Sequence, residues 1–143
     1  MSAYIDTSAL AKCYIRESRS LEVLDWSAEK GGPAISALTV VEFRCLLARR
    51  RRAGQIDGTL ERRALTEFDH HVRNGAWRLH PPVLGDYADA RDLIDLLPAL
   101  PLRSLDAMHL AAARQLGASD FATSDKIQAE AARALGFTVH DFS

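Results

Sequence analysis

Short apolar runs alternate along the chain with longer segments in which apolar residues recur every three or four positions. The first run covers residues 3–5, ends at Asp6 and is followed at once by a helical pattern over residues 7–16, which indicates a buried strand that turns directly into a helix. Further strands are expected at residues 34–37, 76–80, 120–123 and 137–140. Helices are expected from residue 18 or 20 to 30, from 57 or 59 to 74, and at 38–52, 84–97, 105–115 and 124–135.

This alternation predicts an α/β fold in which a mainly parallel central sheet of four or five strands is flanked by helices. The helices at 38–52 and 57–74 are joined by a short turn and should form a hairpin. With 143 residues, of which 48% are hydrophobic, the chain fits one domain spanning residues 1–143. The pattern leaves the order of the strands open.

Composition and charge argue against several classes of protein. No apolar run approaches the length of a bilayer span, and the first residues lack the segments of a secretory signal, so a cytoplasmic protein without membrane contact is expected. Cys13 and Cys45 are isolated thiols without CxxC spacing, which gives no support to a redox motif or a zinc knuckle. The net charge of −1 provides no global basic field, so any site for a polyanion must be built locally.

Acidic residues at helix starts are the main candidates for chemistry. Four of them follow a strand or loop and lie at or near the first turn of a predicted helix: Asp6, Glu42, Asp106 and Asp125. Such junctions gather at one edge of a parallel α/β sheet, so acids far apart in sequence can converge there. Each could instead only complement a helix dipole, an effect of about 0.3–1 kcal/mol. That alternative is weakest for Asp106, whose helix is otherwise almost wholly apolar from Leu105 to Ala113, apart from His109.

Converging carboxylates would repel one another, and a divalent cation resolves this conflict. The ligands would all be oxygen atoms, which favours Mg²⁺ or Mn²⁺ over zinc and leaves open positions for water and a phosphate group. Sites of this kind hydrolyse phosphodiesters. Arg103, just ahead of Asp106, is the best placed arginine for a phosphate contact.

Four motifs resemble those of the PIN domain, in particular the VapC ribonuclease toxins of bacterial toxin–antitoxin pairs. They are YIDTSAL at residues 4–10, VEF at 41–43, LRSLDAMHLA at 102–111 and TSD at 123–125. The resemblance covers essentially the whole chain in the expected order. It implies that the four acids form a catalytic quartet that binds Mg²⁺ or Mn²⁺, and that Thr7, Ser8 and Thr123 support the ligands or contact substrate.

The resemblance further implies cleavage of RNA, inhibition by a cognate small VapB-like antitoxin, and a homodimer. The arginine run at residues 49–52 could contact RNA or antitoxin, or could be only a solvated last helical turn. Four acids spaced every third residue are interpreted as a solvated helix face: Asp86, Asp89, Asp92 and Asp95.

Two alternatives to a ribonuclease remain. A non-enzymatic RNA-binding or regulatory α/β module would use the four acids only as helix caps. A phosphomonoesterase of the haloacid dehalogenase type also places an Asp after its first strand, but it needs a second Asp two residues later, and that position here is Ser8.

Overall fold

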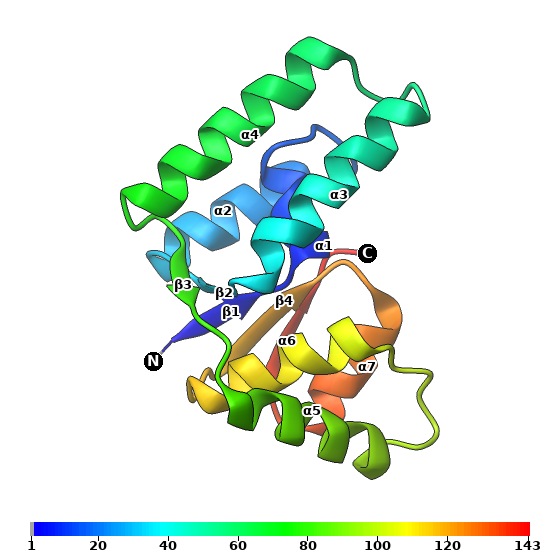
Figure 1. The fold of residues 1–143 in the computed structure, drawn as a ribbon. Coiled ribbons are helices and arrows are strands. Elements are labelled where there is room, and N and C mark those ends of the chain that lie inside the picture. Colours follow the sequence, from blue (N-terminus) through cyan, green and yellow to red (C-terminus); the bar gives the residue numbers. More distant parts are fainter. Residues whose placement is uncertain (1) are drawn as a thin grey trace.

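A five-stranded parallel sheet forms the centre of the computed structural model, which describes residues 2–143 (Figure 1). The strands are β1 (Ala3–Ile5), β2 (Ala34–Ser36), β3 (Arg78–His80), β4 (Asp120–Thr123) and β5 (Thr138–Asp141). Their order across the sheet is β3-β2-β1-β4-β5, and every neighbouring pair is parallel. The predicted parallel sheet of four or five strands is therefore confirmed, and β1 is its central strand.

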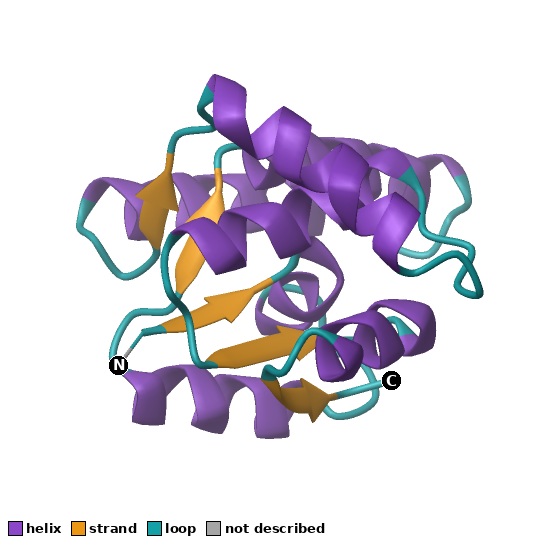
Figure 2. Ribbon diagram, turned by 90° about the horizontal axis from the view of Figure 1, so that it is seen from below, coloured by secondary structure: helices purple, strands orange, loops and turns teal. Residues whose placement is uncertain are grey.

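Within residues 2–143, seven α-helices connect and cover these strands. They are α1 (Thr7–Leu10), α2 (Ser20–Lys30), α3 (Leu38–Arg52), α4 (Gly58–Arg73), α5 (Leu84–Leu96), α6 (Ser104–Gln115) and α7 (Lys126–Ala134). The helices α1 to α4 lie on one face of the sheet and α5 to α7 on the other (Figures 1 and 2). The predicted hairpin is formed by α3 and α4. None of the helices in residues 2–143 is long and apolar enough to cross a membrane.

The first helix is shorter than the sequence predicted. After α1 the chain tightens into a 3-10 turn, η1 (Ala11–Cys13), and then leaves helical geometry. The hydroxyl of Ser20 explains the break, because it accepts a hydrogen bond from the Glu17 N–H at 2.9 Å and donates one to the Ile15 carbonyl at 3.1 Å. These backbone groups are thus satisfied by a side chain instead of a longer helix.

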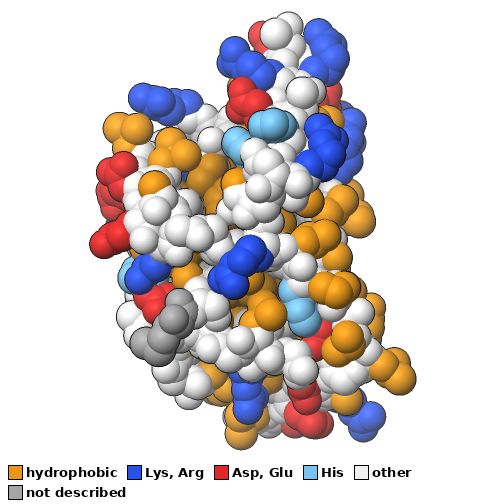
Figure 3. All heavy atoms as spheres, turned by 90° about the vertical axis from the view of Figure 1, so that its left-hand side faces the viewer, with side chains coloured by type: hydrophobic (Ala, Val, Ile, Leu, Met, Phe, Trp, Pro, Cys, Tyr) orange, Lys and Arg blue, Asp and Glu red, His pale blue; other side chains and the backbone are white. Residues whose placement is uncertain are grey.

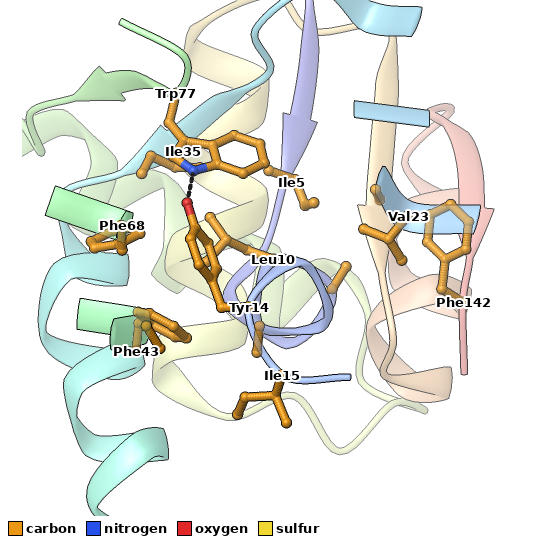
Figure 4. Packing of buried hydrophobic residues seen from close by; sticks show 14 of the residues in the cluster. Ile5, Leu10, Tyr14, Ile15, Val23, Ile35, Phe43, Phe68, Trp77 and Phe142 are labelled. Atoms are coloured by element: carbon orange, nitrogen blue, oxygen red, sulfur yellow. Dashed lines mark hydrogen bonds between the residues drawn. The ribbon is translucent and has the colours of Figure 1, made fainter. Parts of the chain in front are cut away.

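Adjacent residues of β1 serve two separate apolar cores, because successive side chains of a strand point to opposite faces. Ile5 packs in the core beneath α1 to α4, and Tyr4 packs in the core beneath α5 to α7. Figure 4 shows the first core, where Tyr14 accepts a hydrogen bond from Nε1 of Trp77 at 2.7 Å. Helix α6 is buried from Ala107 to Ala113, as its apolar sequence predicted.

A wholly parallel sheet brings the carboxyl ends of all five strands to one edge. Asp6 follows β1 directly, and Ser124 and Asp125 follow β4 directly. The helices α1, α3 and α7 all begin at this edge, because each follows a strand with almost no intervening loop. The fold therefore gathers three of the predicted acidic sites in one region, and the start of α6, which carries Asp106, is joined to that of α7 by a hydrogen bond from Gln128.

Candidate functional site

Asp6 lies at the junction of β1 and α1 and is 4% exposed. Its Oδ1 accepts hydrogen bonds from the Ser8 hydroxyl at 2.6 Å and from the Ala9 N–H at 3.2 Å. The carboxylate is thus a helix cap, as the simpler interpretation predicted. Burial nevertheless raises the pKa of Asp6, although the His109 charge and the hydrogen bonds from Ser8, Thr123 and Ala9 lower it in part. Ionising a carboxyl group that is buried this deeply costs free energy unless a cation lies nearby.

Glu42 accepts hydrogen bonds from one neutral side chain and one ionisable side chain. Its Oε1 accepts a hydrogen bond from the Thr7 hydroxyl at 2.7 Å and one from Nε2 of His109 at 2.5 Å. Burial alone would raise the pKa of Glu42, but the hydrogen bond and charge of His109, together with the bond from Thr7, bring it below its usual value. Glu42 follows the first turn of α3 and does not lie within it, so its role as a helix-dipole residue is smaller than the sequence suggested.

His109 is the residue that sequence reasoning undervalued. Its position in an apolar helix is typical of a core histidine, and its ring is indeed buried, with Nδ1 2.7 Å from the Tyr4 hydroxyl. Burial lowers the pKa of His109, but the hydrogen bond and charge of Glu42 outweigh this and raise it, with help from Asp6 and Asp106. The ring therefore lies within electrostatic reach of three of the four predicted acids. Its position one turn after Asp106 was the signal in the sequence.

Asp125 is connected to Asp6 through two hydroxyl groups. The Ser8 and Thr123 hydroxyls lie 3.2 Å apart, and Thr123 Oγ1 accepts a hydrogen bond from the Asp125 N–H at 3.0 Å. The Asp125 carboxylate itself caps α7 by accepting from the Gln128 N–H at 3.0 Å. Asp125 therefore lies at the same edge of the sheet as Asp6, and it acts there as the N-cap of α7.

Asp106 lies in the first turn of α6 and is more open to solvent than Asp6. Its side chain is 24% exposed, and Arg103 Nε is 3.7 Å from Oδ2. The Arg103 backbone N–H also donates to Oδ2 at 3.3 Å. Gln128 joins the starts of α6 and α7, because its Nε2 donates to the Asp106 carbonyl at 2.9 Å. The charge in this apolar helix is therefore paired at the surface, where such pairs contribute little stability.

The four acids reach one edge of the sheet, where His109 hydrogen-bonds Glu42 and its pKa is also raised by the charges of Asp6 and Asp106. Their donor chemistry fits a hard divalent cation, since all available ligand atoms are oxygens and the buried Asp6 lacks a Lys or Arg partner among residues 2–143. As the side chains are placed, however, no group of three or more His, Cys, Asp or Glu within residues 2–143 is arranged to hold a metal ion. Glu42 is turned toward His109, and Asp106 toward Arg103.

The residues predicted to contact substrate differ in accessibility. Arg103 is 82% exposed beside Asp106, whereas Thr123 is fully buried and Thr7 is 6% exposed. Ser8 is half-buried and bonded to both Asp6 and the Ser124 N–H. Only Arg103 is therefore open to a large ligand, and the three hydroxyl residues hold the acids in place.

Two cavities lie away from this site. One, of about 440 Å³, is lined mainly by apolar groups between α2, η1 and the loop before β3, and it includes Tyr14 and Trp77. The other, of about 450 Å³, lies between α5 and α6 and includes Asp89 and Asp92.

On α5, Asp86 corrects the prediction of a solvated acidic face, because it is 1% exposed and hydrogen-bonds His80 at 3.0 Å.

Comparisons with known proteins match nearly the whole chain. The sequence model of the PIN domain matches residues 3–134. Ribonuclease VapC47 of Mycobacterium tuberculosis (strain CDC 1551 / Oshkosh) is 33% identical over 142 residues, which cover 94% of this chain and 92% of that protein.

Two solved structures share the fold. The first is VapC20 of Mycobacterium tuberculosis, described as a sarcin-ricin loop cleaving toxin, with a TM-score of 0.72, 20% identity, and coverage of 95% of this chain and 96% of that chain. The second is VapBC2 of Rickettsia felis bound to a DNA fragment from their promoter, with a TM-score of 0.70, 14% identity and full coverage of both chains, 100% each. At these identities the likeness concerns the fold alone.

Proposed function

Because the chain belongs to the PIN domain family, we propose that it is a divalent-metal-dependent endoribonuclease that acts in the cytoplasm as the toxin of a VapBC-type toxin–antitoxin pair. The single observation that carries the proposal is the gathering of four acids from separate elements at the carboxyl edge of the sheet, where a buried histidine hydrogen-bonds one of them, Glu42. The similarity to a protein named as a ribonuclease supports RNA as the substrate.

Asp6 and Asp106 are the proposed principal ligands of Mg²⁺ or Mn²⁺, with Glu42 and Asp125 completing the acidic quartet. When bound, such an ion neutralises charge on a phosphodiester and makes water a better nucleophile. The raised pKa of Asp6 supports its assignment, because a nearby cation would remove the cost of its buried charge.

The protein's own residues fix the geometry in which this chemistry occurs. Ser8 and the Ala9 N–H hold Asp6, and Thr7 and His109 hold Glu42. Each acid is thus oriented by donors from elements of the rigid core, which limits its motion at the reacting centre. The exposed Arg103 is placed to bind a phosphate oxygen of the RNA beside Asp106.

Cleavage of RNA in the presence of Mg²⁺ or Mn²⁺, and its loss with EDTA, is the primary test. Asp6→Asn and Asp106→Asn should each abolish cleavage while the protein stays folded. Asp92→Asn is the matched control, because it removes the same charge from an exposed position on α5 and should leave cleavage intact. Full cleavage by either site variant would rule out the assigned metal role.

Calorimetry separates this proposal from the non-enzymatic alternative. A module whose acids only cap helices should show no saturable Mn²⁺ binding that depends on Asp6 and Asp106. A phosphomonoesterase would form an acid-stable covalent phosphoenzyme on Asp6, and failure to detect that species removes the second alternative.

We also propose a homodimer and a small antitoxin partner. Figure 3 shows hydrophobic side chains in a band along one edge of the molecule. Several large apolar residues are exposed on α3, β3 and the start of α5: Val41, Leu79, Val83, Leu84 and Tyr87. A second copy would remove this surface from water. Light scattering should give the dimer mass for the wild type and the monomer mass for Leu84→Glu. A small open reading frame directly upstream would identify the antitoxin.

A further inference from the structure

Positive charge gathers at the turn of the α3–α4 hairpin. Residues 49–63 contain six arginines and only two acids, Asp57 and Glu61, in a chain whose net charge is −1. Five of these arginines have exposed side chains and are called here the hairpin-tip arginines: Arg49, Arg51, Arg52, Arg62 and Arg63. Figure 3 shows basic side chains gathered at the upper end of the molecule, where this hairpin lies.

Acidic groups near the tip are already engaged elsewhere. Glu61 pairs with Arg44 at 3.2 Å, and the Asp57 carboxylate caps α4 by accepting from the Leu60 N–H at 2.8 Å. The remaining arginine of the segment, Arg50, pairs with Glu17 at 2.9 Å. Within residues 2–143, none of the hairpin-tip arginines forms an ion pair. Their charge is thus uncompensated by the protein itself.

Two of these side chains converge from different helices. A Cβ placed on Gly58 would lie 3.3 Å from Nη2 of Arg51 and 3.3 Å from Nη1 of Arg62. The two guanidinium groups therefore meet above Gly58, no further apart than twice that distance, although like charges repel. Guanidinium groups bind phosphate through two parallel N–H donors, so a pair of them suits an anion with several oxygens.

The hairpin connects this charge to the proposed active site. Helix α3 carries Glu42 near its start and Arg49 seven residues later, which places both on one face of the helix, about 10 Å apart along its axis. That span is about three nucleotide steps of a stacked strand. A strand whose cleaved bond lies beside Glu42 can therefore reach the tip with its neighbouring phosphates.

We propose that the hairpin-tip arginines bind backbone phosphates of the RNA substrate a few nucleotides from the bond that is cut. The ligand class rests on the proposed ribonuclease function. A phosphate backbone fits better than an isolated anion, because five cationic groups are spread over two helices and continue toward the acids. It also offers phosphates at regular spacing, whereas an acidic protein segment would need carboxylates at matching positions.

Fluorescence anisotropy with a labelled single-stranded RNA of mixed sequence tests the proposal, with EDTA present so that no RNA is cut. Each lost phosphate contact should lower the salt slope by about 0.7, so R51Q/R62Q should reduce the slope by about 1.4 and weaken binding about 25-fold at 0.1 M salt. The control R91Q/R114Q removes the same charge from exposed positions on α5 and α6 and should change the dissociation constant less than twofold. Melting temperatures of all three proteins should agree.

Equal weakening by the tip and control variants would overturn the proposal, because it would show a general charge effect. Unchanged RNA binding by R51Q/R62Q would also overturn it, and loss of poly-glutamate binding in that variant would assign the tip to an acidic protein partner instead. The binding assay is independent of catalysis. If the wild type binds RNA more tightly than R51Q/R62Q but cuts none, only the proposed function is contradicted. If the wild type cuts RNA but R51Q/R62Q binds it equally well, only this inference is contradicted.

Discussion

His109→Leu should destabilise the protein more than any surface substitution, because it removes the partner of one partly buried carboxylate and one fully buried hydroxyl. The Glu42 carboxylate would lose its bond from Nε2, and the fully buried Tyr4 hydroxyl would lose its contact with Nδ1. Leucine fills similar space but can neither donate nor accept. The perturbation therefore tests whether the histidine at the proposed site also supports the fold.

The size of the effect follows from the geometry. Removing one partner of a buried ion pair costs about 3–5 kcal/mol, and leaving a buried hydroxyl unpaired costs about 1–3 kcal/mol. The Glu42 side chain is 22% exposed and keeps its bond from Thr7, so water offsets part of the loss. We expect the free energy of unfolding to fall by about 3 kcal/mol, or the melting temperature by about 10 °C.

Urea unfolding followed by circular dichroism, with EDTA present, measures this loss. His109→Gln is the matched control, since its amide can still donate to Glu42, and it should lose less than half as much. In the double variant Glu42→Leu/His109→Leu the unpaired charge is gone, so its loss should be smaller than the sum of the single losses by about 1–3 kcal/mol.

The effect should also depend on pH. The pKa of His109 is raised by Glu42 in the folded protein, so its charged form contributes fully below the unfolded value of about 6.5 and the contribution is lost as pH rises through the folded value. The pKa of Glu42 is lowered, so its contribution is lost as pH falls below its usual range. The difference between wild type and His109→Leu should thus be greatest near pH 5–6. A loss below 1 kcal/mol, or one independent of pH, would refute this reasoning.

Three further predictions concern single acids and metal. Asp6→Asn should raise the free energy of unfolding by about 1 kcal/mol at neutral pH without metal, because burial disfavours the charge that it removes, and thermal unfolding of this variant beside Asp92→Asn checks the sign. Mn²⁺ at a hundredfold excess over its dissociation constant should stabilise the wild type by about 2.7 kcal/mol in the same assay, and equal stabilisation of Asp106→Asn would contradict the ligand assignment. Hydrogen bonds from Ser119, His140 and Lys30 lower the pKa of Asp120 to about 2, so its contribution to stability is present above about pH 4 and is lost as pH falls toward 2. Asp120→Asn should therefore flatten the fall in stability at acid pH. An unchanged fall would show that other groups cause it.

Sequence periodicity predicted the architecture well because its strands and helices carry the expected patterns. The short buried runs and their flanking helices gave the parallel sheet, and the bounds of α3 and β4 were predicted to the residue. The predicted helix over residues 7–16 was too long because the Ser20 side chain captures backbone groups of the preceding loop. Such a contact depends on tertiary structure, which local periodicity does not contain.

The acids illustrate both the reach and the limit of sequence reasoning. Asp6 and Asp125 directly follow parallel strands, and Glu42 lies one turn beyond such a junction, so these three could be placed at one edge. Asp106 follows the loop between α5 and α6, and its place at that edge depends on how α6 packs. The partners of each acid could not be predicted, since the His109–Glu42 contact joins residues 67 positions apart. The burial of Asp86 could not be predicted for the same reason. Its spacing matches that of the exposed acids on α5, but it is buried and hydrogen-bonded to His80.

The central claim is that acids from distant parts of the chain bind one hard cation at the carboxyl edge of the sheet. The most direct measurement is the anomalous scattering of Mn²⁺ in crystals of the protein grown with that ion. We predict a strong peak between the carboxylates of Asp6 and Asp106, and its absence in crystals of Asp6→Asn. A Mn²⁺ peak found only elsewhere, for example at the exposed acids of α5, would contradict the claim.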